Sequence, residues 1–321
     1  MTKPILVCAA DLTHLPHVSD RLAANFELRW ARPATPDNLA RLLPEADAYF
    51  AALEVQLTDQ LIASAPRLRV IATPSTGLDH LDMAAATARD IVVLELKNER
   101  ALLDRITATA ELTWALVLAC ARRLPAAFDA SRQGRWARDA LRGHQIAEKT
   151  FGIIGCGRLG TIVADYARAF RMTVLGYDVH DVRIAGIDHV PLDELLARAD
   201  VVSLHIHLTE ANRGFMNRDR LQQMKPGSIL VNTSRGAIVD EIALIEVLAT
   251  GPLASYGTDV IDGEWRDDLD QHPLIRHARE YGNVVITPHI GGITFESQAM
   301  AYGRTAEMLI DYFASQTRKN E

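Results

Sequence analysis

The sequence predicts an α/β protein with two doubly wound domains, and three observations lead to that fold class. Short apolar runs alternate with segments of helical spacing along most of the chain, as in parallel sheets whose faces are covered by helices. A glycine-spaced turn near the middle of the chain joins an apolar run to an alanine-rich amphipathic segment. The 321 residues are long for one core and suit two domains of ordinary size.

The composition restricts the partners that the protein can have. The formal net charge of -7 does not favour binding to nucleic acid or to an anionic membrane, so we expect neither partner. The apolar run at 112–121 is far shorter than the roughly 20 residues that span a bilayer. The chain enters a strand-like run at once and shows no signal-peptide pattern, which predicts a cytoplasmic protein.

The three cysteines predict neither a disulfide nor a metal site. Cys8, Cys120 and Cys156 lie on separate predicted elements and lack metal-ligand spacing. Cys156 allows a second interpretation, because a thiol beside a helix N-terminus can have a lowered pKa and oxidise easily. We expect the simpler one, in which Cys156 is a small filler in the turn.

The first hundred residues are expected to form a small open sheet. Its parallel strands are predicted at 5–9, 27–30, 48–52, 69–72 and 91–94, with helices at 38–43, 58–65 and 82–89. Ser75, Thr76 and Gly77 follow the fourth strand and would lie where the strands' carboxyl ends form a ligand crevice. Their backbone N–H groups could hold a substrate carboxylate.

A helix is predicted at 106–124 and must be buried, because it is apolar nearly all round. The following segment, 128–142, carries Trp136 among arginines and has no obvious core partner in its own domain. We therefore expect a homodimerisation arm near residues 106–145.

The turn Gly155-x-Gly157-x-x-Gly160 has the form of a dinucleotide-binding motif. Gly155 would allow a sharp turn, Gly157 would admit a pyrophosphate, and Gly160 would let the helix pack closely on the strand. Free N–H groups at the start of that helix, expected over 162–170, would face the phosphates. Without a second half, such a triplet is also compatible with an ordinary strand, turn and helix.

The second half of the motif is an acid at the end of the next strand, 173–177. Asp178 stands there, where a carboxylate accepts hydrogen bonds from an adenosine ribose. A phosphorylated ribose would meet like charge at Asp178, and the next residues, Val179 and His180, offer no arginine to bind it. The cofactor is therefore predicted to be NAD rather than NADP.

The rest of the second domain continues the doubly wound pattern. Further strands are predicted at 201–204, 228–231, 254–257 and 284–287, with helices at 193–199, 218–224 and 240–249. A last helix is predicted at 295–313, long enough to return to the first domain and cover its sheet. Residues 317–321 are expected to form a frayed tail.

Three residues that could carry the chemistry follow strands of the second domain. An arginine such as Arg235 can bind a carboxylate bidentately, and a histidine such as His289 can exchange a proton near neutral pH. A carboxylate such as Glu264 beside that histidine can orient its ring and favour its protonated form.

With these motifs the sequence resembles the D-isomer-specific 2-hydroxyacid dehydrogenases, the family that includes 3-phosphoglycerate, D-lactate, glyoxylate/hydroxypyruvate, formate and phosphite dehydrogenases. The resemblance covers almost the whole chain. It rests on the glycine turn with Asp178, the block from Asn232 to Asp240, Asp259-Val260 followed by Glu264, and Pro288-His289-x-Gly291-Gly292.

The resemblance implies a flavodoxin-like substrate domain, 1–104 with 292–321, into which a Rossmann NAD-binding domain, 105–291, is inserted. It implies hydride transfer between NAD and a 2-hydroxy acid, with His289 as acid and base, Glu264 as its partner and Arg235 on the carboxylate. Substrate-binding residues would be Ser75, Thr76, Gly77, Arg235 and His289. Cofactor-binding residues would be Gly155, Gly157, Arg158, Leu159, Gly160, Asp178, His205, Thr209, Thr233, Ser234, Arg235, Asp259, His289, Gly291 and Gly292.

Departures from the family pattern bear on the substrate. Trp265 and His207 stand where the family usually has proline, and the segment 94–104 is longer than the usual connection beside the substrate. The phosphoglycerate branch carries basic residues aligned with 51–55 and 73–74, whereas this chain has none there and Glu54 is acidic. We therefore expect a small, non-phosphorylated substrate.

Two other functions remain compatible with the same motifs. One is oxidation of another small anion, such as formate or phosphite, by the same cofactor. The other is a non-catalytic, NADH-sensing scaffold like the C-terminal-binding-protein corepressors, which share the fold and the catalytic trio. The chain lacks the extended disordered tails that would favour a scaffold.

Overall fold

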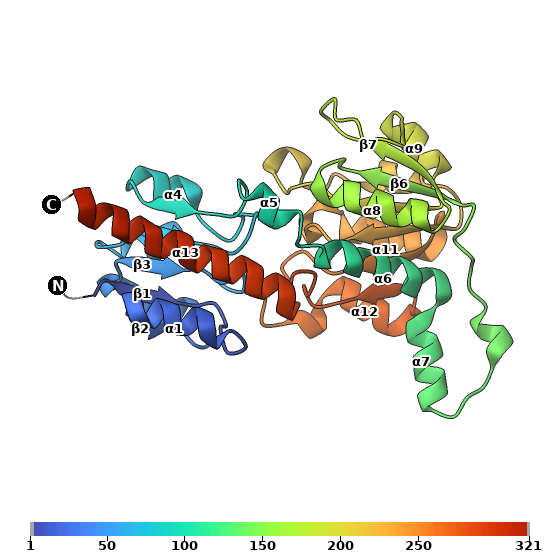
Figure 1. The fold of residues 1–321 in the computed structure, drawn as a ribbon. Helices are drawn as coiled ribbons and strands as arrows, with labels where there is room; N and C mark the ends of the chain where they lie inside the picture. The colour runs from blue at the N-terminus through green and yellow to red at the C-terminus, as the bar shows by residue number, and fades with distance from the viewer. Residues whose placement is uncertain (1–2, 320–321) are drawn as a thin grey trace. The chain divides into compact units, whose positions relative to one another are not determined.

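The computed structural model describes residues 3–319, with side chains for 3–316, and these form two compact units (Figure 1). Unit 1 contains the described residues up to Ile106 and those from Thr294 onwards. Unit 2 is the continuous stretch Thr107–Ile293. The domain boundaries expected from the sequence lie after residues 104 and 291.

Unit 1 is built on a five-stranded parallel sheet with the order β2-β1-β3-β4-β5. This is the flavodoxin-like order, in which the chain winds first to one side of β1 and then to the other. The residues of the three central strands, β1, β3 and β4, are buried on both faces of the sheet, as is typical of parallel sheets. The strands are β1 (Ile5–Cys8), β2 (Glu27–Trp30), β3 (Ala48–Phe50), β4 (Val70–Ala72) and β5 (Val92–Leu94).

Helices cover both faces of this sheet. α1 (Pro16–Asn25) and α13 (Phe295–Lys319) pack on one face, where Val18, Leu22 and Leu309 join the core. The other face is covered by α2 (Pro36–Leu42), α3 (Asp59–Ala63) and α4 (Met83–Ala88). Short 3-10 turns, such as η1 (Leu43–Glu45), complete the connections.

The C-terminal helix is longer than the sequence analysis predicted. α13 continues to Lys319, so the expected frayed tail from residue 317 is wrong for 317–319, while 320–321 lie outside the described residues. No glycine or proline interrupts the chain after Phe313, and basic residues are favourable in the last turn of a helix. The predicted helix ended at the last residue of the apolar pattern, whereas the helical backbone continues beyond that pattern.

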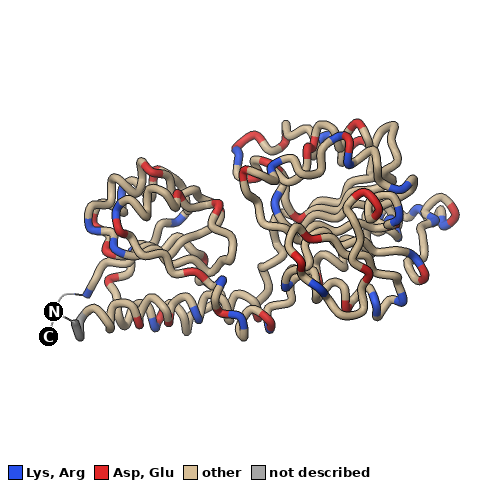
Figure 2. The backbone as a smooth tube through the Cα atoms, turned by 90° about the horizontal axis from the view of Figure 1, so that it is seen from above, with Lys and Arg blue, Asp and Glu red and all other residues tan. Residues whose placement is uncertain are grey.

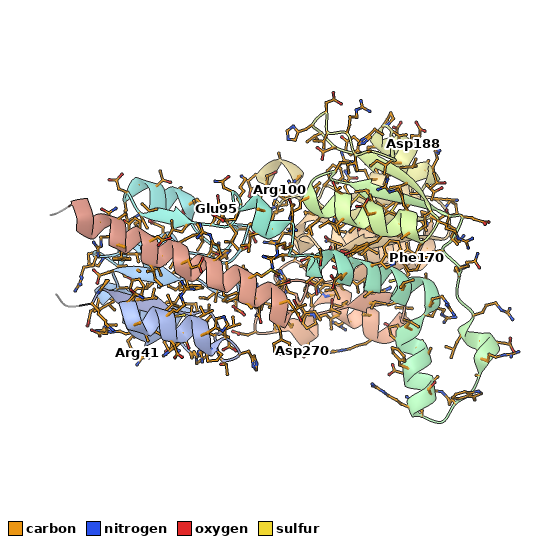
Figure 3. The ribbon with its side chains drawn as sticks, viewed as in Figure 1. Arg41, Glu95, Arg100, Phe170, Asp188 and Asp270 are labelled. Atoms are coloured by element: carbon orange, nitrogen blue, oxygen red, sulfur yellow. The ribbon has the colours of Figure 1, made fainter. Side chains whose placement is uncertain are left out.

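The long segment after β5 is an ordered part of unit 1. It contains the helix α5 (Arg100–Leu103). Figure 3 labels Glu95, in this segment, and Arg100, the first residue of the helix. Leu96 and Leu103 are buried against Ala301 of α13. Both carboxylate oxygens of Glu99 accept hydrogen bonds of 3.0 Å from the Arg304 guanidinium, so the segment is fixed to α13.

Unit 2 is built on a seven-stranded parallel sheet with the order β12-β11-β10-β9-β6-β7-β8. The order reverses between β6 and β9, the position at which open α/β sheets bind ligands. The strands are β6 (Thr150–Ile154), β7 (Thr173–Tyr177), β8 (Asp188–His189), β9 (Val201–Leu204), β10 (Ser228–Asn232), β11 (Leu253–Thr258) and β12 (Val284–Ile286).

Two layers of helices cover this sheet. α6 (Ala108–Arg122) and α8 (Arg158–Ala169) pack on one face, where Trp114 contacts Phe170, labelled in Figure 3. α9 (Leu192–Arg198), α10 (Arg218–Gln222), α11 (Glu241–Thr250) and α12 (Pro273–Tyr281) belong to the other face. The doubly wound α/β fold class predicted from the sequence is therefore confirmed.

Beyond α6 the chain leaves the body of unit 2. α7 (Leu124–Arg132) starts after Arg123, whose backbone is left-handed, and the 3-10 turn η2 (Arg138–Leu141) follows. Figure 1 shows this stretch standing off the sheet and its helices. Phe128 is 59% exposed and Trp136 is 86% exposed, although both side chains are large and apolar.

Lysine and arginine are interspersed with aspartate and glutamate in both units (Figure 2). Within residues 3–319, no helix combines the length and the apolar character that crossing a bilayer would need.

Candidate active site

The glycine turn between β6 and α8 has the close contacts that its sequence predicts. Gly155 has a φ of +100°, and a Cβ atom there would lie 2.4 Å from the carbonyl oxygen of His205. A Cβ atom at Gly160 would lie 2.1 Å from the carbonyl oxygen of Gly155, so the helix rests directly on the turn. α8 begins at Arg158, not at Ile162 as predicted, because its apolar periodicity becomes visible only after the first turn.

The second half of the motif lies beside the first. The Asp178 carboxylate follows β7 and accepts hydrogen bonds from the backbone N–H groups of Cys156, at 2.8 Å, and His180, at 2.9 Å. Burial, followed by the nearby Asp178 charge, raises the pKa of Cys156 to about 11. Cys156 is therefore a buried filler rather than a reactive thiol, as expected.

The turn fits a dinucleotide. Apart from Gly157 and its two chain neighbours, no atom of the described residues lies within 4 Å of the position that a Cβ at Gly157 would occupy, and the N–H groups of the first turn of α8 start there. The buried Nδ1 of His205 has no hydrogen-bond partner among the described residues, although its Nε2 lies 2.9 Å from Ser203 Oγ. Burial also lowers the pKa of His205 to about 4, so this ring is neutral.

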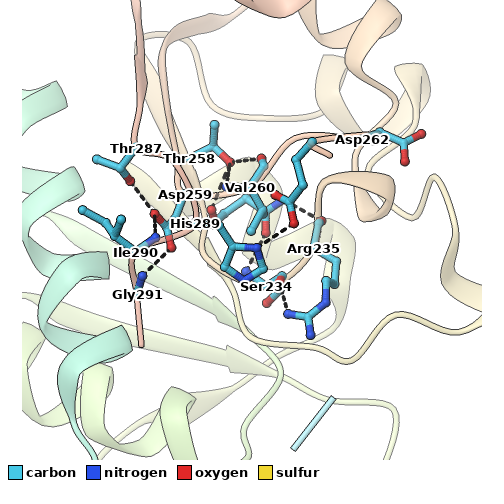
Figure 4. Close-up of polar contacts among 12 residues, drawn as sticks. Ser234, Arg235, Thr258, Asp259, Val260, Asp262, Thr287, His289, Ile290 and Gly291 are labelled. Atoms are coloured by element: carbon cyan, nitrogen blue, oxygen red, sulfur yellow. Dashed lines mark hydrogen bonds and ion pairs between the residues drawn. The ribbon is translucent and has the colours of Figure 1, made fainter. Parts of the chain in front are cut away.

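Asp259, at the carboxyl end of β11, fixes the segment that carries His289. Its Oδ1 accepts hydrogen bonds from Thr287 Oγ1 at 2.6 Å and from the Ile290 N–H at 2.9 Å, and its Oδ2 accepts one from the Gly291 N–H at 2.7 Å (Figure 4). Burial raises the pKa of Asp259, although these bonds act in the opposite direction. The segment after β12 is thus held at three points.

His289 lies in this held segment in an unusual backbone conformation. Its φ is +54°, a region that non-glycine residues rarely adopt, and its N–H donates to the Asp259 carbonyl at 2.8 Å. Such conformations persist where surrounding bonds impose them, and they cluster at functional sites. The surrounding hydrogen bonds, and not the conformational preference of the His289 backbone, therefore set the orientation of the imidazole.

The His289 ring contacts the acid that the sequence analysis assigned to it. Its Nδ1 lies 2.6 Å from Glu264 Oε1, and the two side chains are 15% and 18% exposed. An ionised carboxylate only accepts hydrogen bonds, so the hydrogen belongs to Nδ1 and Nε2 is left for the substrate. Trp265 stacks on the ring, with centroids 6.0 Å apart and an angle of 23° between the planes.

Arg235 follows β10 in the same cluster (Figure 4). Its backbone carbonyl accepts a hydrogen bond of 2.9 Å from Asn232 Nδ2, and its Nη1 donates to the Ser234 carbonyl at 2.8 Å. A Cβ atom at Gly236 would lie 2.0 Å from the Ile261 carbonyl carbon, so the segments that follow β10 and β11 approach each other closely beside the site. The structure thus brings Arg235, Glu264 and His289 to one edge of the sheet.

Other residues assigned to the cofactor have internal partners. Ser234 Oγ donates to the Leu204 carbonyl at 2.8 Å, and Thr233 Oγ1 lies 2.7 Å from Thr113 Oγ1. Thr209 caps the turn η3 (Glu210–Asn212). Arg158 and Leu159 stand in the first turn of α8, and Gly292 follows the segment held by Asp259. Their cofactor contacts stay predictions.

The predicted substrate loop belongs to unit 1. Ser75, Thr76 and Gly77 follow β4 at the carboxyl edge of its sheet, and Ser75 Oγ accepts a hydrogen bond of 3.1 Å from the Gly77 N–H. Thr73 Oγ1 lies 3.1 Å from His80 Nε2 just before the loop. The role of this loop in substrate binding remains a prediction.

Sequence reasoning missed several residues around the site. Trp265 was noted only as a departure from proline, whereas Glu241 and His272, buried behind the Glu264 segment, were not noted at all. Pro273 at the first turn of α12 and Gly282 after its end are sequence signals that could have revealed that helix and its cap, His272. Among residues 3–319, no group of three or more His, Cys, Asp or Glu side chains could hold a metal ion.

Comparison with known proteins agrees with this geometry. Residues 114–291 match the family model described as D-isomer specific 2-hydroxyacid dehydrogenase, NAD binding domain. A D-3-phosphoglycerate dehydrogenase of Mycobacterium tuberculosis is 37% identical over 311 residues, which cover 96% of this chain and 56% of that protein. The chain thus spans about half the length of such curated relatives.

Two further similarities extend over most of both partners. A hydroxypyruvate reductase of Thermotoga maritima is 36% identical over 263 residues, covering 82% of this chain and 83% of that protein. The solved structure of a D-lactate dehydrogenase from Aquifex aeolicus, complexed with NAD and lactic acid, aligns with a TM-score of 0.85 at 28% identity, covering 98% and 96%. By its sequence, its fold and its NAD-binding domain, this chain belongs to the D-isomer specific 2-hydroxyacid dehydrogenase family.

Proposed function

We propose that this protein is an NAD-dependent dehydrogenase that interconverts a small, non-phosphorylated 2-hydroxy acid and its 2-oxo acid. The observation that carries this proposal is the His289–Glu264 pair, joined over 2.6 Å at the carboxyl edge of the unit 2 sheet. The glycine turn opens at the same edge of that sheet, where its N–H groups suit a pyrophosphate.

The chain's own residues would handle the proton. When bound, NAD supplies the hydride chemistry, accepting a hydride from the carbinol carbon or returning it to the carbonyl carbon. His289 takes the hydroxyl proton at Nε2 during oxidation and returns it during reduction. Glu264 keeps the Nδ1 hydrogen in place and stabilises the positive charge of the doubly protonated ring.

Arg235 is suited to the substrate's carboxylate. Its planar guanidinium can form two parallel hydrogen bonds to a carboxylate, and its charge polarises a neighbouring keto oxygen. The hydrogen bond from Nη1 to the Ser234 carbonyl fixes one end of the guanidinium group and so limits the orientations that its other N–H groups can take. Ser75, Thr76 and Gly77 are proposed as the second carboxylate-binding element.

A non-phosphorylated substrate is favoured by the chemistry of unit 1. Residues 51–55 and 73–74 follow the neighbouring strands β3 and β4 and contain no lysine or arginine, while Glu54 adds a negative charge. A phosphate bound by these two segments would find no counter-charge in them. Steady turnover of 3-phosphoglycerate or its oxo acid, at rates comparable to hydroxypyruvate, would contradict this part of the proposal.

We also propose that the protein is a homodimer joined through an arm formed by α7 and the segment to residue 145. The exposed Phe128 and Trp136 support this assignment, since large apolar side chains at such exposure are typical of interaction surfaces. Equilibrium sedimentation at micromolar concentration should give a dimer, and Phe128→Ser with Trp136→Ser should shift it towards monomer. A wild-type monomer under these conditions would refute the arm.

We propose a cytoplasmic location because the cysteines form no disulfide bond among the described residues. Cys8, Cys120 and Cys156 are free and buried, which suits a reducing compartment. Cell fractionation should place the protein with cytoplasmic markers.

The activity is tested with a panel of substrates and one matched variant. NADH oxidation is followed with glyoxylate, hydroxypyruvate, pyruvate and longer 2-oxo acids, and NAD reduction with formate and phosphite. We expect turnover of at least one 2-oxo acid, and Arg235→Lys should lower kcat/KM by roughly a hundredfold, because the bidentate geometry is lost. Arg218→Lys, at an exposed ion pair with Glu246, is the control. Binding of NADH without any turnover would favour a sensing scaffold.

A further inference from the structure

A buried carboxylate and a buried imidazole lie behind the segment that carries Glu264, and the proposed reaction does not use either directly. Glu241 is the first residue of α11 and is 9% exposed. His272 caps the N-terminus of α12 and is 4% exposed. Their side chains lie 3.3 Å apart, between His272 Nε2 and Glu241 Oε2. We call these two residues the Asp262 clamp, after the peptide that they hold.

The clamp binds both backbone polar groups of Asp262. Glu241 Oε1 accepts a hydrogen bond of 3.0 Å from the Asp262 N–H. His272 Nε2 lies 3.0 Å from the Asp262 carbonyl oxygen. The other ring nitrogen, Nδ1, accepts the Leu274 N–H at 3.3 Å and therefore carries no proton. The hydrogen must be on Nε2, so His272 is a neutral ring that donates to the Asp262 carbonyl.

Only Gly263 separates this held peptide from Glu264. Gly263 has a φ of +73°, and a Cβ atom there would contact only a side-chain carbon of Arg266, at 3.8 Å. The Gly263 carbonyl accepts a hydrogen bond of 3.2 Å from the Arg266 N–H, but no close side-chain contact restrains Gly263 itself, so the nearest fixed backbone before Glu264 is the Asp262 peptide. The position of Glu264, 2.6 Å from His289 Nδ1, therefore depends on an anchor just before Gly263.

We propose that Glu241 and His272 are positioning residues that hold the Asp262 peptide so that Glu264 stays in contact with His289 Nδ1. This inference rests on the proposed role of the Glu264–His289 pair. It gives a function to two polar groups whose burial is otherwise costly, because well-packed apolar residues usually stabilise a core at least as well as a buried polar pair.

The experiment uses two substitutions at position 272 that separate capping from clamping. His272→Asn keeps an acceptor for the Leu274 N–H, since asparagine is a good N-cap, but it is too short to reach the Asp262 carbonyl. His272→Gln has an amide N–H that can reach this carbonyl, but its capping ability is poorer. Glu241→Gln is a second clamp variant that keeps the shape of the side chain, in case His272→Asn fails to fold.

The readout is the titration of the His289 ring in the full-length chain, followed by NMR with ¹³C-labelled histidine and assigned with His289→Asn. Glu264→Gln should move the pH midpoint of this signal downward, because the ring loses its anionic partner. His272→Asn should move it the same way by roughly half a pH unit, about threefold in proton affinity. Adding His272→Asn to Glu264→Gln should cause no further movement, and His272→Gln should stay near wild type.

Two results would overturn the inference. One is a His289 midpoint that stays at the wild-type value in folded His272→Asn and in folded Glu241→Gln, which would leave the clamp a purely structural role. The other is a further shift when His272→Asn is added to Glu264→Gln, since the clamp would then act independently of Glu264. The titration needs no turnover, so a wild-type chain that reduces no oxo acid would refute the proposed function without deciding this test.

Discussion

Glu264 accepts a hydrogen bond from Nδ1 of His289 over 2.6 Å, and this contact assigns the two ring nitrogens their tasks. Nδ1 is occupied by the carboxylate, so only Nε2 can exchange a proton with a substrate. The contact depends on the left-handed backbone of His289, which the bonds to Asp259 impose. The segments after β11 and β12 thus set the geometry on which the proposed acid–base role of His289 depends.

Glu264→Gln should shift the pH dependence of oxo-acid reduction. Reduction needs the protonated ring, which the Glu264 charge favours, so the neutral variant should lose activity at a lower pH than wild type. At pH 7 and above we expect kcat to fall about tenfold or more. The measurement is kcat against pH for both proteins, with Glu246→Gln, in an exposed pair, as the control. An unchanged alkaline limb would remove Glu264 from this role.

Asp178→Ala should weaken the selectivity for NADH over NADPH. In the role proposed for it, the carboxylate binds the ribose hydroxyls and repels a 2′-phosphate, so its loss should raise the Kd for NADH by about tenfold and leave that for NADPH equal or lower. Fluorescence titration with each cofactor measures both constants. Asp181→Ala, at an exposed pair with Arg183, should change neither. Retention of the wild-type preference in Asp178→Ala would contradict the assignment.

The stacking of Trp265 on His289 should make indole emission a sensor of the ring's protonation. A protonated imidazole in contact with an indole quenches its fluorescence, and the cation is also attracted to the indole face. Emission should therefore increase as the pH rises through the ring titration, and this step should vanish in Trp265→Phe and in His289→Asn. Trp136→Phe, on the arm, should keep the step. Persistence of the step in His289→Asn would mean that another group causes it.

Glu241 should make the stability of the protein depend on pH. Burial raises its pKa from 4.5 to about 7, so between these values the folded chain holds a proton that the unfolded chain has released. The contribution of this group to the free energy of unfolding therefore falls as pH rises across that window, by about 3 kcal/mol at most. Urea unfolding at fixed protein concentration should show this fall in wild type relative to Glu241→Gln. A difference that is constant from pH 4.5 to 8 would contradict it.

The sequence allowed prediction of those parts of the molecule that rest on local patterns. The turn from Gly155 to Gly160 and the acid at Asp178 could be found because the spacing of the glycines and the acid after the next strand form a motif within one short stretch of sequence. The strands could be found because both faces of a parallel sheet are buried and their residues form continuous apolar runs. The roles proposed for Arg235, Glu264 and His289 came from their residue types, from their places after strands and from the resemblance to the family, which is now confirmed.

Features that depend on distant contacts could not be predicted. α12 has few apolar residues and is marked mainly by Pro273, while β8 has only two residues. The Asp262 clamp joins Glu241 of α11 to His272 of α12, and nothing in either local sequence indicates the other. The position of Trp265 beside the active site likewise becomes visible only from its stacking on the His289 ring. Pairings of this kind are produced by tertiary packing and have no periodic signature.

The most direct test of the proposed function is the kinetics of NADH oxidation by 2-oxo acids with wild type and His289→Asn. We predict turnover of a small 2-oxo acid by wild type, and a fall in kcat of roughly a hundredfold or more in the variant with the Kd for NADH little changed. If His289→Asn retained the wild-type kcat, or if folded wild type bound NADH and reduced no oxo acid, the proposed dehydrogenase function would be wrong.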